Sequence, residues 1–353
     1  MLNKYLKKNL PPKEYKNFFN QLKNSRTNKF GFFNPINIFY ESDKEIIKFT
    51  ENLLIERYLR FGFKKKDINL ILKYLKKNKN QNPEISRKYI NRNLLNFKGK
   101  YFEKIIKNYI PKRYSITLKY INKIVNLKKF KTIVDFGCGT NELGKNIAKD
   151  KSKKVIGMDV INYSEKFEQK NLRYIKMKNP NQIPVKKFDL LILNGVIHHI
   201  DLEHLDKFLN NLSQKMTQKS RVLLFEDSWT NDKFHDDKDL DKKNNIKFMN
   251  IQKKFSDFEI VKIYSFFDWI GNILTRNLLN ISMPYNFNSL KDWEKIFARS
   301  GMVLEKKLNI GFFKNTLHRQ GYVIMLFKKD KNKKIVKNSI DDFLKKYLSY
   351  LKQ

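Results

Sequence analysis

The sequence has very little cysteine, and its residue spacing leaves little room for a metal site. A single cysteine, Cys138, excludes both an intramolecular disulfide framework and a cysteine-rich zinc site. The spacing of histidine, cysteine and acidic residues indicates no metal site of any other kind. No apolar run reaches the length of a membrane span, and the segment that starts at Met1 lacks the apolar middle of a signal peptide. We therefore expect a cytoplasmic protein without a transmembrane segment.

Arginine and alanine are also scarce, and this changes how the charge is interpreted. The 353 residues carry a net charge of +39, but this comes from 63 lysines and only 11 arginines. Alanine occurs twice, whereas phenylalanine and tyrosine together number 46, a bias typical of AT-rich codons. Nucleic-acid contacts favour arginine for its fixed fork of donors. The charge therefore does not favour a nucleic-acid partner, although it leaves one open.

The charge and the apolar pattern divide the chain into three parts. At 41% hydrophobic residues the chain can bury a core, which excludes disorder throughout. The net charge is +23 over residues 1–130, +5 over residues 131–230 and +11 over the remainder. Apolar residues at helical spacing between Ile46 and Leu75 predict helices in the first part, with Asp67 as an N-cap. The predicted parts are a basic, mainly helical accessory region at 1–125, a nucleotide-binding-type domain at 126–330 and an amphipathic helical tail at 331–353.

Strands and helices alternate from residue 131 onward, which predicts a doubly wound α/β sheet. The predicted strands are residues 132–136, 154–158, 172–175, 188–193 and 220–225. The predicted helices between and after them are residues 142–149, 202–216 and 289–300. Two closing strands are predicted at residues 302–310 and 321–327.

One glycine-rich turn carries the chemistry. The first predicted strand runs into Asp135, Gly137, Cys138 and Gly139, and two glycines spaced by one residue allow a ligand to approach bare backbone. The following helix offers free N–H groups to that ligand. Asp159 ends the next strand 20 residues beyond Gly139, where a carboxylate can accept hydrogen bonds from both ribose hydroxyls. Glu142 occupies the third glycine position of the dinucleotide fingerprint, so that fingerprint is absent.

The pattern instead resembles motif I of the class I S-adenosylmethionine-dependent methyltransferases. The resemblance covers about residues 114–327 and implies a seven-stranded Rossmann-like sheet with an antiparallel last strand. It implies S-adenosylmethionine as the cofactor. The histidine pair at the end of the fourth strand is similar to methyltransferases of the ubiquinone- and menaquinone-biosynthesis type. The cofactor-binding residues that the resemblance implies are Asp135, Gly137, Cys138, Gly139, Asp159, Val160, Asn179, Pro180 and Asn194.

Two positions depart from the family pattern. The third glycine of the loop is Asn141, which tolerates left-handed backbone better than most residues. Asn179 stands where the family usually has the aspartate that reads the adenine amino group. Its amide oxygen can still accept a hydrogen bond, though without charge.

The acceptor side of the site is less defined. His199 is the candidate catalytic base, needed only if the acceptor loses a proton during methyl transfer; the alternative is that the histidines only shape the cofactor floor. Glu226 and Asp227 end the fifth strand and are expected in the ligand crevice. Residues 229–288 form an insertion, with a polar, mobile loop expected at 231–245 and an apolar helix at 263–274. That helix, which supplies Trp269 and leads to Tyr285, is expected to be a lid over a hydrophobic acceptor, or alternatively an amphipathic helix on a bilayer.

Three functions remain from the sequence. The leading one is a methyltransferase for a small-molecule or lipid-like acceptor. The others are an RNA methyltransferase that uses the basic N-terminal region as a clamp, and a binding protein that kept the fold but lost activity. The sequence does not define the methyl acceptor or the oligomeric state.

Overall fold

The centre of the molecule is a seven-stranded mixed sheet. The computed structural model describes residues 34–60, 62–94, 100–160, 169–178, 183–200, 202–272, 283–314 and 320–330. The strand order is β3-β2-β1-β4-β5-β7-β6, with β1 to β5 parallel and β7 antiparallel to both of its neighbours. The strands are β1 (Thr132–Phe136), β2 (Lys154–Asp159), β3 (Leu172–Lys176), β4 (Leu190–Asn194), β5 (Arg221–Asp227), β6 (Met302–Gly311) and β7 (Tyr322–Lys329). This confirms the predicted fold class and its antiparallel last strand.

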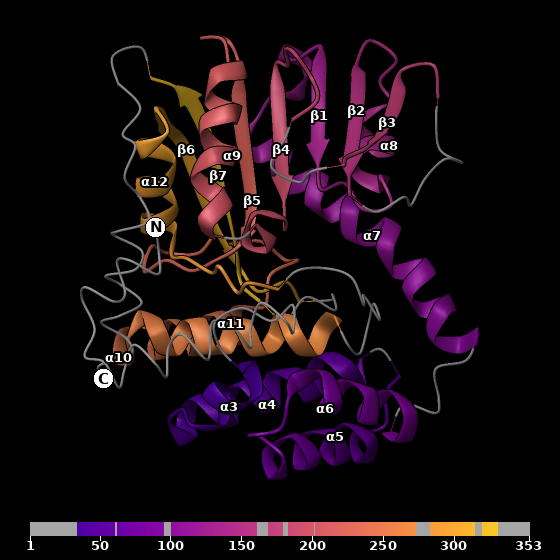
Figure 1. The fold of residues 1–353 in the computed structure, drawn as a ribbon, viewed down its shortest axis with the longest axis vertical. Coiled ribbons are helices and arrows are strands. Elements are labelled where there is room, and N and C mark those ends of the chain that lie inside the picture. The colour runs from indigo at the N-terminus through magenta and orange to yellow at the C-terminus, as the bar shows by residue number, and fades with distance from the viewer. Residues whose placement is uncertain are drawn as a thin grey trace.

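Helices cover both faces of this sheet (Figure 1). One face packs its apolar side chains against α9 (Leu202–Lys215) and α12 (Leu290–Arg299). The other face packs against α7 (Lys100–Ile124) and α8 (Glu142–Ile147). Ser289 caps α12 by accepting a hydrogen bond from the Asp292 N–H.

A second helical layer lies across the carboxyl ends of the parallel strands (Figure 1). The insertion forms α10 (Lys242–Lys254) and α11 (Asp257–Gly271). Below α11 lie α3 (Pro35–Tyr40), α4 (Lys44–Leu59), α5 (Lys65–Lys77) and α6 (Pro83–Tyr89), followed by a π-helical turn at Ile90–Leu94. Helices α3, α4 and α5 share one apolar core with α10 and α11, in which the rings of Phe39 and Phe266 stack with centroids 4.0 Å apart. Helix α11 is therefore covered from the sheet side and from the N-terminal side.

Three local predictions were wrong. Helix α5 begins at Lys65, so Asp67 lies in its first turn and does not cap it. The loop expected at 231–245 ends earlier, because Asp241 caps α10 through the Asn244 N–H and the helix starts at Lys242. The bilayer alternative for the apolar helix fails because the residues of α11 from Ile260 to Gly271 are buried except for Lys262.

The structure does not test the predicted domain organisation. The tail at 331–353 lies outside the described residues, and the domain limits 1–125 and 126–330 remain predictions. Among the described residues, no helix is both long and apolar enough to cross a membrane.

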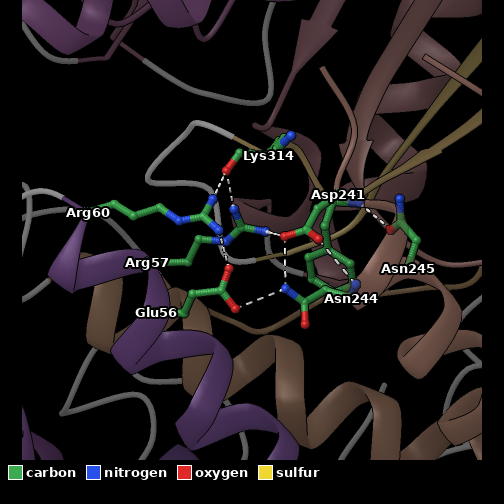
Figure 2. Close-up of polar contacts among 8 residues, drawn as sticks. Glu56, Arg57, Arg60, Asp241, Asn244, Asn245 and Lys314 are labelled. Carbon is green, nitrogen blue, oxygen red and sulfur yellow. Dashed lines mark hydrogen bonds and ion pairs between the residues drawn. The ribbon is translucent and has the colours of Figure 1, made fainter. Parts of the chain in front are cut away.

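A buried ion pair ties the N-terminal helices to the insertion (Figure 2). The Arg57 side chain on α4 is fully buried and donates from Nη2 to Asp241 Oδ2 at 2.6 Å. Its Nη1 donates to the Lys314 carbonyl at 2.7 Å. Asp241 also accepts from Asn244 Nδ2 at 2.8 Å, and Asn244 reaches Glu56 as well. The contact joins α4, the start of α10 and the segment after β6 in one polar network.

Candidate functional site

The glycine-rich turn after β1 adopts a conformation that requires glycine. Gly137 and Gly139 have φ values of +70° and +52°, in the left-handed region that favours glycine. A Cβ atom on Gly137 would lie 2.2 Å from Val196 Cγ2, so this glycine lets the turn pass beneath the loop after β4. The nearest atom to a Cβ on Gly139 is the Tyr114 hydroxyl oxygen at 3.9 Å, which leaves the backbone of Gly139 open to a ligand.

Asp159 is held directly against this turn. The Gly139 N–H donates to Asp159 Oδ2 at 2.8 Å, which joins the end of β2 to the glycine turn. Val160, the next residue, is 42% exposed. The predicted partners of the cofactor at Asn179 and Pro180 lie outside the described residues.

Asn141 replaces the third glycine without breaking the turn. Its φ is +59°, the left-handed conformation that the sequence analysis expected asparagine to tolerate. The side chain is fully buried between Gly144 and Gly157, where a Cβ atom would come within 2.2 Å and 2.4 Å of Asn141 Oδ1. Gly144 and Gly157 thus leave room for the Asn141 side-chain amide at the position where the family has glycine.

Asp135 and Cys138 are buried beneath the same turn. Burial, together with repulsion from Asp159, raises the pKa of Asp135 to about 7. Among the described residues, Asp135 Oδ2 has no hydrogen-bond partner. Burial also raises the pKa of the Cys138 thiol, which makes it an inert packing residue and not a nucleophile.

The loop after β4 brings a histidine against the end of β5. The 3-10 turn η3 (Ile197–His199) follows Asn194, the half-buried last residue of β4. His198 Nδ1 lies 2.5 Å from Glu226 Oε1 in a buried hydrogen bond. Burial alone would lower the pKa of His198, but the carboxylates of Glu226, Asp268 and Asp227 outweigh it and raise the pKa to about 9. His199, the candidate base, is half-buried with its ring centroid 4.1 Å from that of His198.

Helix α11 supplies a third acidic group to this pocket. Asp268 Oδ1 lies 4.0 Å from His198 Nε2 and accepts from Asn272 Nδ2 at 2.8 Å. Burial raises the pKa of the neighbouring Asp227 to about 6, although His198 opposes the rise. Oδ1 of Asp227 and Oδ2 of Asp268 are buried and find no hydrogen-bond partner within the described part of the chain.

The two aromatic candidates differ in their relation to this pocket. Trp269 is fully buried in the core between α11 and the N-terminal helices. Tyr285 has a φ of +55°, a strained conformation for a tyrosine, and its hydroxyl is buried near Asp268. Tyr285 therefore lies beside the polar cluster, whereas Trp269 belongs to the supporting core.

The sequence analysis missed a contribution from α7. Its Arg113 places Nη2 3.9 Å from the position of a Cβ on Gly195, the glycine that follows β4. Tyr114, one residue on, faces Gly139 in the same way. Both side chains border the glycine turns at the carboxyl end of the sheet. No pattern in the sequence marked Arg113 as part of the site.

Comparison with known proteins places these features in a known class. A family model described as a methyltransferase domain matches residues 106–269. No curated protein matches the chain by sequence. Similar solved structures include human N-acetylserotonin methyltransferase in complex with SAM, at 14% identity and a TM-score of 0.42 over 65% of this chain and 56% of that one. A second is the mitomycin 7-O-methyltransferase MmcR, at 12% identity and a TM-score of 0.38 over 59% of this chain and 52% of that one. A third is a Burkholderia thailandensis 1,6-didemethyltoxoflavin-N1-methyltransferase, at 10% identity and a TM-score of 0.35 over 57% of this chain and 71% of that one.

The chain thus spans little more than half the length of the first two structures. The matched family model and the strand order of the sheet agree with the glycine-turn motif in β1 and the acid at the end of β2. Residues 106–269 therefore match a methyltransferase domain, and the sheet that contains them has the Rossmann-like fold implied by the resemblance to class I S-adenosylmethionine-dependent methyltransferases.

Proposed function

We propose that this protein transfers a methyl group from S-adenosylmethionine to a small-molecule or lipid-like acceptor. The observation that carries the proposal is the contact between the Gly139 amide and Asp159 at the carboxyl end of the parallel strands. A carboxylate, an open glycine backbone and the N-terminus of a helix therefore lie together at the carboxyl ends of the parallel strands. Doubly wound sheets bind their ligands at this edge.

The residues at this edge fit the chemistry of the cofactor. Asp159 would accept hydrogen bonds from the ribose hydroxyls, and the open backbone at Gly139 would pass beside the methionine portion. Arg113 offers a cation near Gly195 for the cofactor carboxylate. Asn179 and Pro180 remain proposed contacts of the adenine. The cofactor supplies an electrophilic methyl group on its sulfonium, so the protein mainly has to position the acceptor in line with it.

The arrangement of the second helical layer supports a small acceptor. His198, Asp268 and Tyr285 each expose less than a tenth of their surface, beneath a helix that α3 and α4 cover from the other side. The N-terminal helices therefore use their apolar faces to pack on the insertion, and only their outer faces remain for other partners. A compact acceptor can reach such a centre after a small opening of the layer, whereas an RNA duplex cannot.

The RNA alternative has one observation of its own. Lys112, Lys145, Lys149 and Lys151 line a surface groove between α7 and α8, beside the cofactor turn. Lysines on a groove can hold phosphates, but Lys145 already pairs with Glu142, and lysine is abundant over the whole chain. The inactive alternative would be a chain that binds no cofactor or binds it without transferring the methyl group.

Transfer of a labelled methyl group separates these functions. The full chain would be incubated with methyl-tritiated S-adenosylmethionine and, separately, with metabolite, lipid and RNA fractions. We expect label in the metabolite or lipid fraction, and its loss in the Asp159→Ala variant. Label in RNA, lost on raising the salt concentration, would identify the clamp function instead. Cofactor binding without label in any fraction would support the inactive binding protein.

A further inference from the structure

The structure brings together three side chains that the sequence keeps far apart. His198 and His199 follow β4, and Asp268, which is 70 residues after His198 in the chain, lies on α11. One nitrogen from each imidazole and one oxygen of Asp268 all lie within 4.8 Å of one another. Two bonds of about 2.0–2.2 Å that meet at the tetrahedral angle would place the two ligand atoms roughly 3.3–3.6 Å apart. The 4.0 Å between His198 Nε2 and Asp268 Oδ1 is roughly 0.5 Å longer, so the two side chains would move slightly toward each other on binding an ion.

Glu226 orients one of these side chains, His198, through its Nδ1 atom. Glu226 accepts from the backbone N–H groups of Ile197 and Asp227 and contacts His198 Nδ1, so both of its oxygens are engaged. A carboxylate on one ring nitrogen of a histidine fixes the tautomer that presents the other nitrogen to a metal. Nε2 of His198 is the nitrogen that faces Asp268. Glu226 therefore has the position of a supporting residue and not of a ligand.

The carboxylate of Asp268 supplies independent support for a cation. Asp268 is 6% exposed, and its Oδ2 is buried with no hydrogen-bond partner among the described residues. Its Oδ1 is already oriented by Asn272 Nδ2. A buried carboxylate oxygen without a partner is costly, and a bound cation removes that cost.

We propose that His198, His199 and Asp268 bind a divalent transition-metal ion. Two imidazoles and one carboxylate favour Zn²⁺ and its neighbours over Mg²⁺ or Ca²⁺, which prefer oxygen ligands. Three protein ligands leave at least one open position on the ion, at the carboxyl end of the sheet. The proposal departs from the sequence analysis, which predicted no metal site from the spacing of histidine, cysteine and acidic residues.

The open position indicates a role, which rests on the proposed function. An acceptor hydroxyl or carboxylate bound to the ion would be held near the cofactor, and a metal-bound hydroxyl loses its proton more readily. An ion in this site would lower the pKa of the bound acceptor hydroxyl so that its proton can pass to solvent water, and His199 would then be a ligand and not the base.

Zinc binding by the full chain tests the site without any methyl transfer. The protein would be stripped with a chelator, dialysed, and titrated calorimetrically with Zn²⁺ and then with Mg²⁺. We expect one Zn²⁺ per chain and no comparable heat from Mg²⁺. Asp268→Asn should weaken zinc binding by more than the about 10- to 100-fold expected for the supporting change Glu226→Gln. The Asp268→Asn substitution keeps the shape of the side chain and the acceptor oxygen for Asn272.

Two matched variants serve as controls. His204→Gln removes an exposed histidine six residues from His198, and Asp227→Asn removes another buried acid next to it. Both should bind zinc as the parent does. No zinc binding in the parent, unchanged binding in Asp268→Asn, or a loss confined to a control variant would overturn the proposal.

X-ray absorption of the zinc-loaded parent provides a test that needs no variant. The expected spectrum has nitrogen and oxygen ligands including two imidazoles. Sulfur from Cys138 in the coordination shell would contradict the assignment. Zinc bound as predicted, with no methyl transfer to any fraction, would overturn the proposed function alone.

Discussion

The buried ion pair between Arg57 and Asp241 makes a quantitative prediction about how the chain is held together. Replacing Arg57 by alanine removes two hydrogen bonds, at 2.6 Å to Asp241 and at 2.7 Å to the Lys314 carbonyl, from a fully buried side chain. Asp241 would keep Asn244 as a partner but lose its counter-ion while only 7% exposed. Removing one partner of a buried pair costs about 3–5 kcal/mol. We expect that loss in the free energy of unfolding, measured by urea denaturation.

Arg60 provides the matched control on the same helix. Its side chain also donates to the Lys314 carbonyl and pairs with Glu56, but it is one-third exposed. Arg60→Ala should cost less than about 1 kcal/mol, because exposed pairs contribute little. The double change of Arg57→Met with Asp241→Leu should cost less than the sum of its single changes, since no buried charge is left alone. Equal losses in Arg57→Ala and Arg60→Ala would refute the idea that this contact anchors the N-terminal helices to the insertion.

Two further predictions concern the glycine-rich turn after β1. Because the folded pKa of Asp135 is raised to about 7, the parent loses stability as pH rises from about 4 to about 7. Asp135→Asn should remove that loss. The free energy of unfolding of the variant, measured with urea, should therefore exceed that of the parent by an amount that grows across this pH range to at most roughly 4 kcal/mol. A difference between the two proteins that does not change with pH would contradict the raised pKa of Asp135. Gly137→Ala should lower the melting temperature more than Gly139→Ala, because the new methyl group would clash with Val196 at 2.2 Å in the former and lies 3.9 Å from the nearest atom, the Tyr114 hydroxyl oxygen, in the latter. Gly139→Ala should instead lose most of the stabilisation by S-adenosylhomocysteine, and equal melting temperatures for both variants would argue against this geometry.

The sheet was largely predictable because short apolar runs define its strands locally. The strand β1 was predicted with the bounds observed, and the other strands shifted by at most two residues at either end. The left-handed turn at Asn141 was also predictable, because the residue type determines which backbone conformations are accessible. Helix α10 was missed because its lysines and asparagines resemble a loop in composition. Its cap at Asp241 and its buried asparagines depend on contacts with distant segments.

The site was predictable as a set of positions but not as a set of contacts. The order of motifs identified Asp135, Gly139, Asp159 and the histidine pair. The pairing of His198 with Glu226 spans 28 residues, and the approach of Asp268 spans 70, so neither follows from local spacing. The burial of Arg57 was not predictable for the same reason. Its sequence neighbourhood is rich in lysine and indicates an exposed charge, whereas its partner Asp241 lies 184 residues away in the chain.

The central claim is that the turn around Gly139 and the carboxylate of Asp159 form an S-adenosylmethionine site. Isothermal titration of S-adenosylhomocysteine into the parent, Asp159→Ala and Asp150→Ala tests it most directly. Asp150 is an exposed acid in the turn before β2 and serves as the matched control. The account predicts one site per chain in the parent and in Asp150→Ala, with affinity lowered roughly 10- to 100-fold in Asp159→Ala, because hydrogen bonds to a charged group contribute about 1.5–3 kcal/mol. No binding in the parent, or equal affinity in all three proteins, would contradict it.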